Sequence, residues 1–190
     1  MRAAVEVMAE SGYHHAQIAR IARIAGVADG TVYLYFKNKE DILVSLLRRS
    51  IEKIVEKLQA SMCSMDGAAD KLDYLVHLYL RELGADPKLA MVTQVHMRQV
   101  DAGIRRAIGE FMKPLYDVLD GIIEDGVRQG VFRPSMDRRI ARRMIFGTID
   151  ETVTAWVLTG SKYDLHAQAD AVVDVLLNGL KVRPQVHQVR

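Results

Sequence analysis

Apolar residues recur at helical spacing along almost the whole chain. Intervals of three and four residues join Leu72, Leu75, Tyr79 and Leu83, and similar stripes occur elsewhere. No segment bounded by turn residues alternates apolar and polar positions with the period of two that indicates a strand. The pattern therefore predicts an all-α protein.

Glycines and polar breaks divide the first part of this pattern into four helices. A short first helix should end at Gly12, a second should stop at Gly26, and a third should begin near Ala28. After a break around Lys37 and Asn38, one apolar stripe continues through a long fourth helix. This helix is long enough to join two regions of the protein.

The remaining sequence predicts further helices with recognisable ends. Pro114 lies inside one apolar stripe, so a kink or a break is expected there. The breaks and caps that bound these helices are residues 64–67, Asp86 with Pro87, Gly130, Pro134 with Ser135 and Asp137, and Gly160. A last helix is expected to cover about Leu165 to Leu180.

Composition narrows the class of protein only slightly. The 190 residues are 49% hydrophobic, enough for a sizeable core, and the formal net charge of +2 does not by itself indicate nucleic acid. Cys63 is the single cysteine, so no internal disulfide can form. Glu6 and Glu10 interrupt any signal-peptide pattern, and no stretch of about 20 apolar residues occurs. We expect a cytoplasmic protein with no membrane partner.

Residues 18–35 have the pattern of a helix-turn-helix corner. Ile21 and Ala25 are predicted to face inward, and Ala22 is small where a second helix must cross closely. Gly26 can adopt the positive φ of the tight turn, and Val27 is predicted to fill the corner. Such a corner favours DNA reading over a plain structural role.

The second helix of this corner would read DNA. Val32 and Tyr35 are predicted to face inward, while its N-terminal end enters the major groove. Lys37 and Lys39 follow, where ammonium groups can meet phosphates. Asp29 either accepts a hydrogen bond from cytosine N4 or complements the helix dipole. The predicted DNA-binding residues are Gln17, Asp29, Gly30, Thr31, Tyr33, Leu34, Tyr35, Lys37 and Lys39.

The segment "IARIAGVADGTVYLYFKNKEDIL" resembles the tetracycline-repressor (TetR) family of bacterial regulators. The resemblance implies an N-terminal three-helix DNA-binding domain, here residues 1–40, and a helical effector-binding and dimerisation domain, residues 41–190. It also implies repression of transcription.

The family usually has a longer first helix preceded by a basic arm. Here the first helix is expected to be truncated, because Met1 falls almost inside it. Either this start is internal to the true reading frame, or the domain lacks an arm.

Together with "RRMIFGTIDETVTAWVL", that segment is similar to the acyl-CoA-responsive FadR group, which regulates fatty-acid degradation. The resemblance implies a homodimeric repressor that long-chain acyl-CoA releases from a palindromic operator, without a further cofactor. A TetR-type repressor of another hydrophobic molecule, for example one that controls an efflux pump, is the alternative.

Arginine suits phosphates because its guanidinium can bind them bidentately, and three arginines lie close together in "HMRQVDAGIRRAI". They are candidates for the phosphates of CoA, with a solvated basic face as the alternative. For the aromatic candidates, core packing is the alternative. The predicted ligand-binding residues are Arg98, Arg105, Arg106, Tyr79, Phe111, Phe146 and Trp156. Arg138, Arg139, Arg142 and Arg143 are interpreted as a surface stripe.

An enzyme has little support in the sequence. The chain lacks G-x-S-x-G, G-x-G-x-x-G and P-loop motifs, and its histidines give no close pair for a metal. Asp150 and Glu151 lie inside an otherwise apolar helix, where use at a pocket wall or dimer seam is favoured over catalysis. Gly147, Thr148 and Ala155 would allow close helix contact, so this helix and the last one are the predicted dimer interface.

Overall fold

The structure, a computed structural model, describes residues 1–96 and 102–181. Within them the secondary structure is helical, apart from one isolated bridge between Phe132 and Lys181. The all-α prediction is therefore confirmed. The elements are α1 (Arg2–His15), α2 (Ile18–Ala25), α3 (Asp29–Tyr35), α4 (Lys39–Met62), α5 (Ala68–Gly84), α6 (Pro87–His96), α7 (Ala102–Arg128), α8 (Arg138–Leu158), the 3-10 helix η1 (His166–Gln168) and α9 (Ala169–Leu180).

Side-chain caps stand at the starts of three helices, and a glycine follows the end of α2, near the positions that the sequence predicts. Gly26 follows α2 with φ 70° and ψ 30°, a left-handed conformation that glycine adopts without strain. The backbone N–H of Asp41 donates to Asn38 Oδ1 over 2.8 Å at the start of α4. Asp86 and Asp137 cap α6 and α8 in the same way, each accepting a backbone N–H bond of 3.0 Å.

Two predicted breaks differ from the structure. Gly12 leaves helical geometry, with φ 71° and ψ 160°, but helical turns continue to His15. Pro114, where the sequence predicts a kink or a break, lies within α7 without ending it, so no break occurs there. Pro114 and Glu110 are both exposed, so water can satisfy the Glu110 carbonyl, which loses its helical donor.

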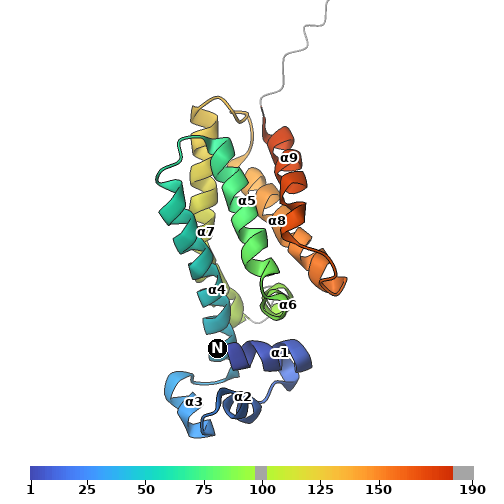
Figure 1. The fold of residues 1–190 in the computed structure, drawn as a ribbon. Helices are drawn as coiled ribbons and strands as arrows, with labels where there is room; N and C mark the ends of the chain where they lie inside the picture. Colours follow the sequence, from blue (N-terminus) through green and yellow to red (C-terminus); the bar gives the residue numbers. More distant parts are fainter. Residues whose placement is uncertain (97–101, 182–190) are drawn as a thin grey trace, which may run out of the picture.

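Helices α1, α2 and α3 form a small unit at one end of the molecule, and the longer helices form a bundle at the other (Figure 1). Helix α4 begins at the small unit and runs into the bundle, where it packs along α7. Its apolar stripe, including Ile42, Leu46, Ile54 and Leu58, is buried. The long fourth helix therefore connects the two regions, as its length predicts.

The C-terminal end of α7 is fixed by a close approach between its backbone and Phe132. The backbone N–H groups of Val131 and Phe132 both donate to the Gly126 carbonyl, over 2.9 and 3.0 Å. The Phe132 ring, which is fully buried, lies directly against Gly126. A side chain at position 126 would overlap this ring, so glycine is required there.

Candidate nucleic-acid interface and effector region

The α2–α3 corner is packed as a helix-turn-helix. Ile21 and Ala22 of α2 and Val32 of α3 are buried. The Val27 N–H donates to the Ala22 carbonyl over 3.0 Å, which closes the turn around Gly26. These contacts fix the direction in which α3 leaves the corner.

Three residues predicted to face inward do not. Ala25 is exposed, Val27 is 40% exposed and Tyr35 is 76% exposed. The prediction for Tyr35 fails because α3 ends there, and Phe36, with extended backbone at φ −135°, packs against the core instead. Ala25 and Val27 border an open hollow of about 160 Å³ between α1, α2 and α3.

Most of the predicted DNA-binding residues are exposed at the small unit. Tyr33 and Leu34 are 56% and 81% exposed, whereas Thr31 is half-buried. Gln17 lies at the N-cap of α2 and is also exposed. The exposed members of the predicted set are Gln17, Asp29, Gly30, Tyr33, Leu34, Tyr35 and Lys37.

Lys39 has an additional role inside the protein. Its Nζ donates to the His14 carbonyl over 2.8 Å and lies 4.8 Å from the centre of the Tyr13 ring. These contacts tie the start of α4 to the end of α1. Because an ammonium group has three N–H donors, a phosphate contact stays compatible with this arrangement.

An aromatic cluster joins three helices of the bundle. Phe146 of α8 meets Tyr79 of α5 and Tyr116 of α7 edge to face, with ring centres 6.3 and 5.7 Å apart. Tyr79 is buried. The pKa of the Tyr116 hydroxyl is raised above its usual value, mainly because the group is partly buried, and the nearby Arg142 guanidinium opposes this shift in part. Tyr116 is absent from the candidates named from sequence, although it lies beside Leu115 on the apolar stripe of α7.

The other two aromatic candidates lie outside this cluster. Trp156 is buried and donates its indole N–H to the Tyr163 carbonyl over 2.7 Å, which anchors the loop between α8 and α9. Phe111 is buried beneath the Arg48 guanidinium, 5.9 Å from its ring centre. The structure thus brings together only Tyr79 and Phe146 of the predicted aromatic set.

The arginine candidates divide between the surface and the bundle. Arg105 and Arg106 are exposed near the start of α7, and Arg98 lies outside the described residues. Arg142, predicted as part of a surface stripe, is half-buried instead. It bonds Asp120 over 2.5 Å and covers the Tyr116 ring at 5.2 Å. Arg138, Arg139 and Arg143 are exposed as predicted.

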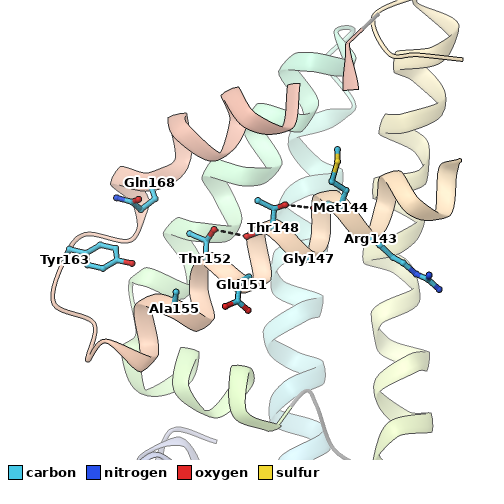
Figure 2. Close-up of a pocket in the computed structure, with 9 residues that line it drawn as sticks. All are labelled: Arg143, Met144, Gly147, Thr148, Glu151, Thr152, Ala155, Tyr163 and Gln168. Carbon is cyan, nitrogen blue, oxygen red and sulfur yellow. Dashed lines mark hydrogen bonds between the residues drawn. The ribbon is translucent and has the colours of Figure 1, made fainter. Parts of the chain in front are cut away.

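Helix α8 presents a face of small residues to an open hollow of about 670 Å³ (Figure 2). Gly147, Thr148 and Ala155 line it, and so does Glu151, whose side chain is exposed. The Thr148 hydroxyl donates to the Met144 carbonyl over 2.6 Å, which satisfies it within the helix. Asp150 is half-buried.

Models of protein families match both parts of the chain. The model of bacterial regulatory proteins of the TetR family matches residues 1–46, and that of the C-terminal region of YsiA-like proteins matches residues 47–179. The chain belongs to the TetR family. Its N-terminal helix-turn-helix unit and C-terminal helical domain are those of the family fold.

Several relatives of this TetR-family chain are similar along almost their full length. The fatty acid metabolism regulator protein of Bacillus subtilis is 46% identical over 178 residues, which are 94% of this chain and 92% of the relative. The crystal structure of the transcriptional regulator FadR from Bacillus subtilis in complex with stearoyl-CoA has a TM-score of 0.90 and 45% identity, covering 94% and 96% of the two chains. FadR from Bacillus halodurans, a fatty acid degradation regulator, has a TM-score of 0.89 and 46% identity, covering 95% and 97%.

Helix α6 links the bundle of this TetR-family protein to its DNA-binding unit. Gln94 is buried, and its Oε1 accepts a 2.9 Å hydrogen bond from the Thr154 hydroxyl on α8. His96, also buried, meets the Tyr13 ring of α1 edge to face at 5.5 Å. At the other end of α6, Lys88 lies 3.4 Å from Glu10 of α1. Helix α6 therefore contacts both α8 and α1.

Across residues 1–96 and 102–181, no helix is long and apolar enough to cross a membrane. The same ranges contain no group of three or more His, Cys, Asp or Glu side chains arranged to hold a metal ion.

Proposed function

We propose that this protein is a transcriptional repressor of fatty-acid degradation genes and that long-chain acyl-CoA releases it from its operator. One observation carries the proposal: the match, at 45–46% identity along almost the whole chain, to a fatty acid metabolism regulator whose crystal structure contains stearoyl-CoA. DNA binding is assigned to residues 1–40, and effector binding and dimerisation to residues 41–190. The protein acts in the cytoplasm by binding, without catalysis or a further cofactor.

The DNA-binding form is a homodimer on a palindromic operator. A two-fold dimer presents two α3 helices about 34 Å apart, the distance between successive major grooves. Helices α8 and α9 form the interface. The small residues Gly147 and Ala155 support this assignment, as do exposed Leu158 and Val175, which are 73% and 65% exposed in the single chain.

The effector occupies the bundle, with its acyl chain among apolar side chains near Tyr79 and Phe146. Arg105 and Arg106 are exposed near the start of α7, a helix that packs along α4, and their guanidinium groups suit the phosphates of CoA. Binding changes operator affinity only if the ligand prefers a conformation that the operator does not. Helix α4, which passes from the bundle to α3, and helix α6, which contacts α1, carry that change to the DNA-binding unit.

The test is fluorescence anisotropy of a labelled operator duplex from the promoter of a fatty-acid degradation gene. We expect stearoyl-CoA to lower the operator affinity at least tenfold, whereas free CoA and stearate, each offering one half of the ligand, have much weaker effects. Unchanged affinity in the presence of stearoyl-CoA would contradict the effector assignment.

A charge-reversal variant separates acyl-CoA from a neutral hydrophobic effector. Arg105→Glu with Arg106→Glu should raise the stearoyl-CoA concentration needed for release, because two phosphate partners are lost. Thermal stability should change little, since both side chains are exposed. An unchanged response would favour a repressor of another hydrophobic molecule.

A further inference from the structure

The outward face of α3 carries an apolar side chain that no intramolecular contact requires. Leu34 is 81% exposed, more than any other large apolar residue in the described ranges. Single exposed leucines are common on protein surfaces. This one, however, lies on the helix that the corner directs toward DNA.

The packing of the corner fixes which side of α3 faces outward. Val32 is buried and turns one side of the helix inward. Gly30, Tyr33 and Leu34 share the opposite face, because residues three and four apart are neighbours on a helix. Apart from its chain neighbours and the backbone of α3, no atom lies within 4 Å of the position that a Cβ would occupy on Gly30, so the face around Leu34 is open there as well.

The chemistry of this face limits what it can recognise. Helix α3 contains no lysine or arginine, so it cannot form the bidentate contact that selects guanine. A leucine side chain has no hydrogen-bonding group. The apolar feature that base pairs present in the major groove is the C5-methyl group of thymine.

We infer that Leu34 is a specificity-determining residue that contacts a thymine C5-methyl group in each half of the operator. This inference rests on the proposed function as a DNA-binding repressor. Tyr33, which is 56% exposed on the same face, also has an apolar ring, but its hydroxyl can bond a phosphate. Variants of the two residues separate these roles.

Deoxyuridine replaces thymidine with the loss of one methyl group and no other change at the base edge. A duplex selected by the wild-type protein from random-sequence DNA is resynthesised with each thymine replaced in turn. At one thymine in each half-site, we expect replacement to weaken binding about fourfold, the factor that corresponds to burial of one methyl-sized group. Replacement in both half-sites should weaken binding about fifteenfold, if the two sites are independent.

Leu34→Ala is the decisive variant, and Tyr33→Ala is its matched comparison. Leu34→Ala should bind the thymine and uracil duplexes equally, whereas Tyr33→Ala should keep the fourfold ratio despite weaker binding to both. Because Leu34 is exposed, its variant should retain the wild-type circular dichroism spectrum and melting temperature.

Three results would overturn the inference alone: no sensitive thymine, a Leu34→Ala variant that keeps the wild-type ratio, or a ratio lost in Tyr33→Ala instead. A wild-type protein that selects no duplex from random DNA would overturn the proposed function, and the inference with it.

Discussion

His96 is a buried imidazole at the contact between α6 and α1, and its protonation state affects stability. Burial lowers the pKa of His96, and positive charge on neighbouring His14 lowers it further. The folded protein therefore favours neutral His96, whereas an unfolded histidine takes up a proton near pH 6.5. Stability contributed by neutral His96 is present above about pH 6.5 and is lost as the pH falls toward the pKa of the folded state.

We expect the free energy of unfolding in urea to be lower at pH 5.5 than at pH 7.5. His96→Phe keeps an aromatic ring against Tyr13 but cannot be protonated, so it should reduce this difference. His15→Gln, at an exposed histidine, is the control and should behave like the wild-type protein. An equal pH dependence in His96→Phe and wild type would contradict this role of His96.

Single residues also show where sequence patterns are sufficient. The role of Gly26 is predictable because it depends on the conformation of its own backbone. The role of Asp137 is predictable because it caps the first turn of the helix that follows it. The orientation of Tyr35 is not predictable in this way, because it depends on α3 ending at that residue. Arg142 is misassigned from sequence since its partners, Asp120 and the Tyr116 ring, lie on another helix.

At the scale of helices, α7 illustrates two different uses of glycine. Gly126 is buried against Phe132, so Gly126→Ala should destabilise the protein by about 1–3 kcal/mol through overlap with a buried ring. Gly121 is exposed and lies well inside the same helix, away from its ends. No neighbouring atom lies within 4 Å of the position that an alanine methyl group would occupy there. Gly121→Ala should therefore stabilise the protein by about 0.5–1 kcal/mol.

Urea denaturation of both variants measures these opposite effects in a single helix. Equal effects of the two substitutions would show that helix propensity dominates and that the Phe132 contact yields easily.

The helices themselves are the most predictable part of this protein, because their apolar stripes and caps are local. Their contacts, such as Gly126 with Phe132, depend on how the chain returns after α7.

At the scale of the whole molecule, the proposed association of two chains rests on the small-residue face of α8. Ala155→Arg would replace a methyl group by a long charged side chain that overlaps the partner chain in the proposed interface. Sedimentation velocity should show a shift from dimer to monomer, and operator affinity should fall at least tenfold because one α3 alone reads half a site.

Ala102→Arg, at an exposed position on α7 that does not line this hollow, is the matched control and should remain dimeric. A dimeric Ala155→Arg variant would place the interface elsewhere.

The sequence predicts Gly147, Thr148 and Ala155 for this surface because small residues at helical spacing can be recognised within one short segment. It assigns Asp150 and Glu151 alike to a pocket wall or dimer seam, and that Glu151 borders the hollow depends on how α8 is rotated in the bundle.

Trp156 is the single tryptophan of the chain, and its indole N–H is held by the Tyr163 carbonyl at the loop between α8 and α9. All of the indole fluorescence of the protein therefore originates at one buried position beside the proposed interface. Exposure of this side chain to water would shift its emission to longer wavelength. The protein thus contains a built-in optical reporter of the α8–α9 loop, which can be followed without an attached dye during dimer dissociation or effector binding.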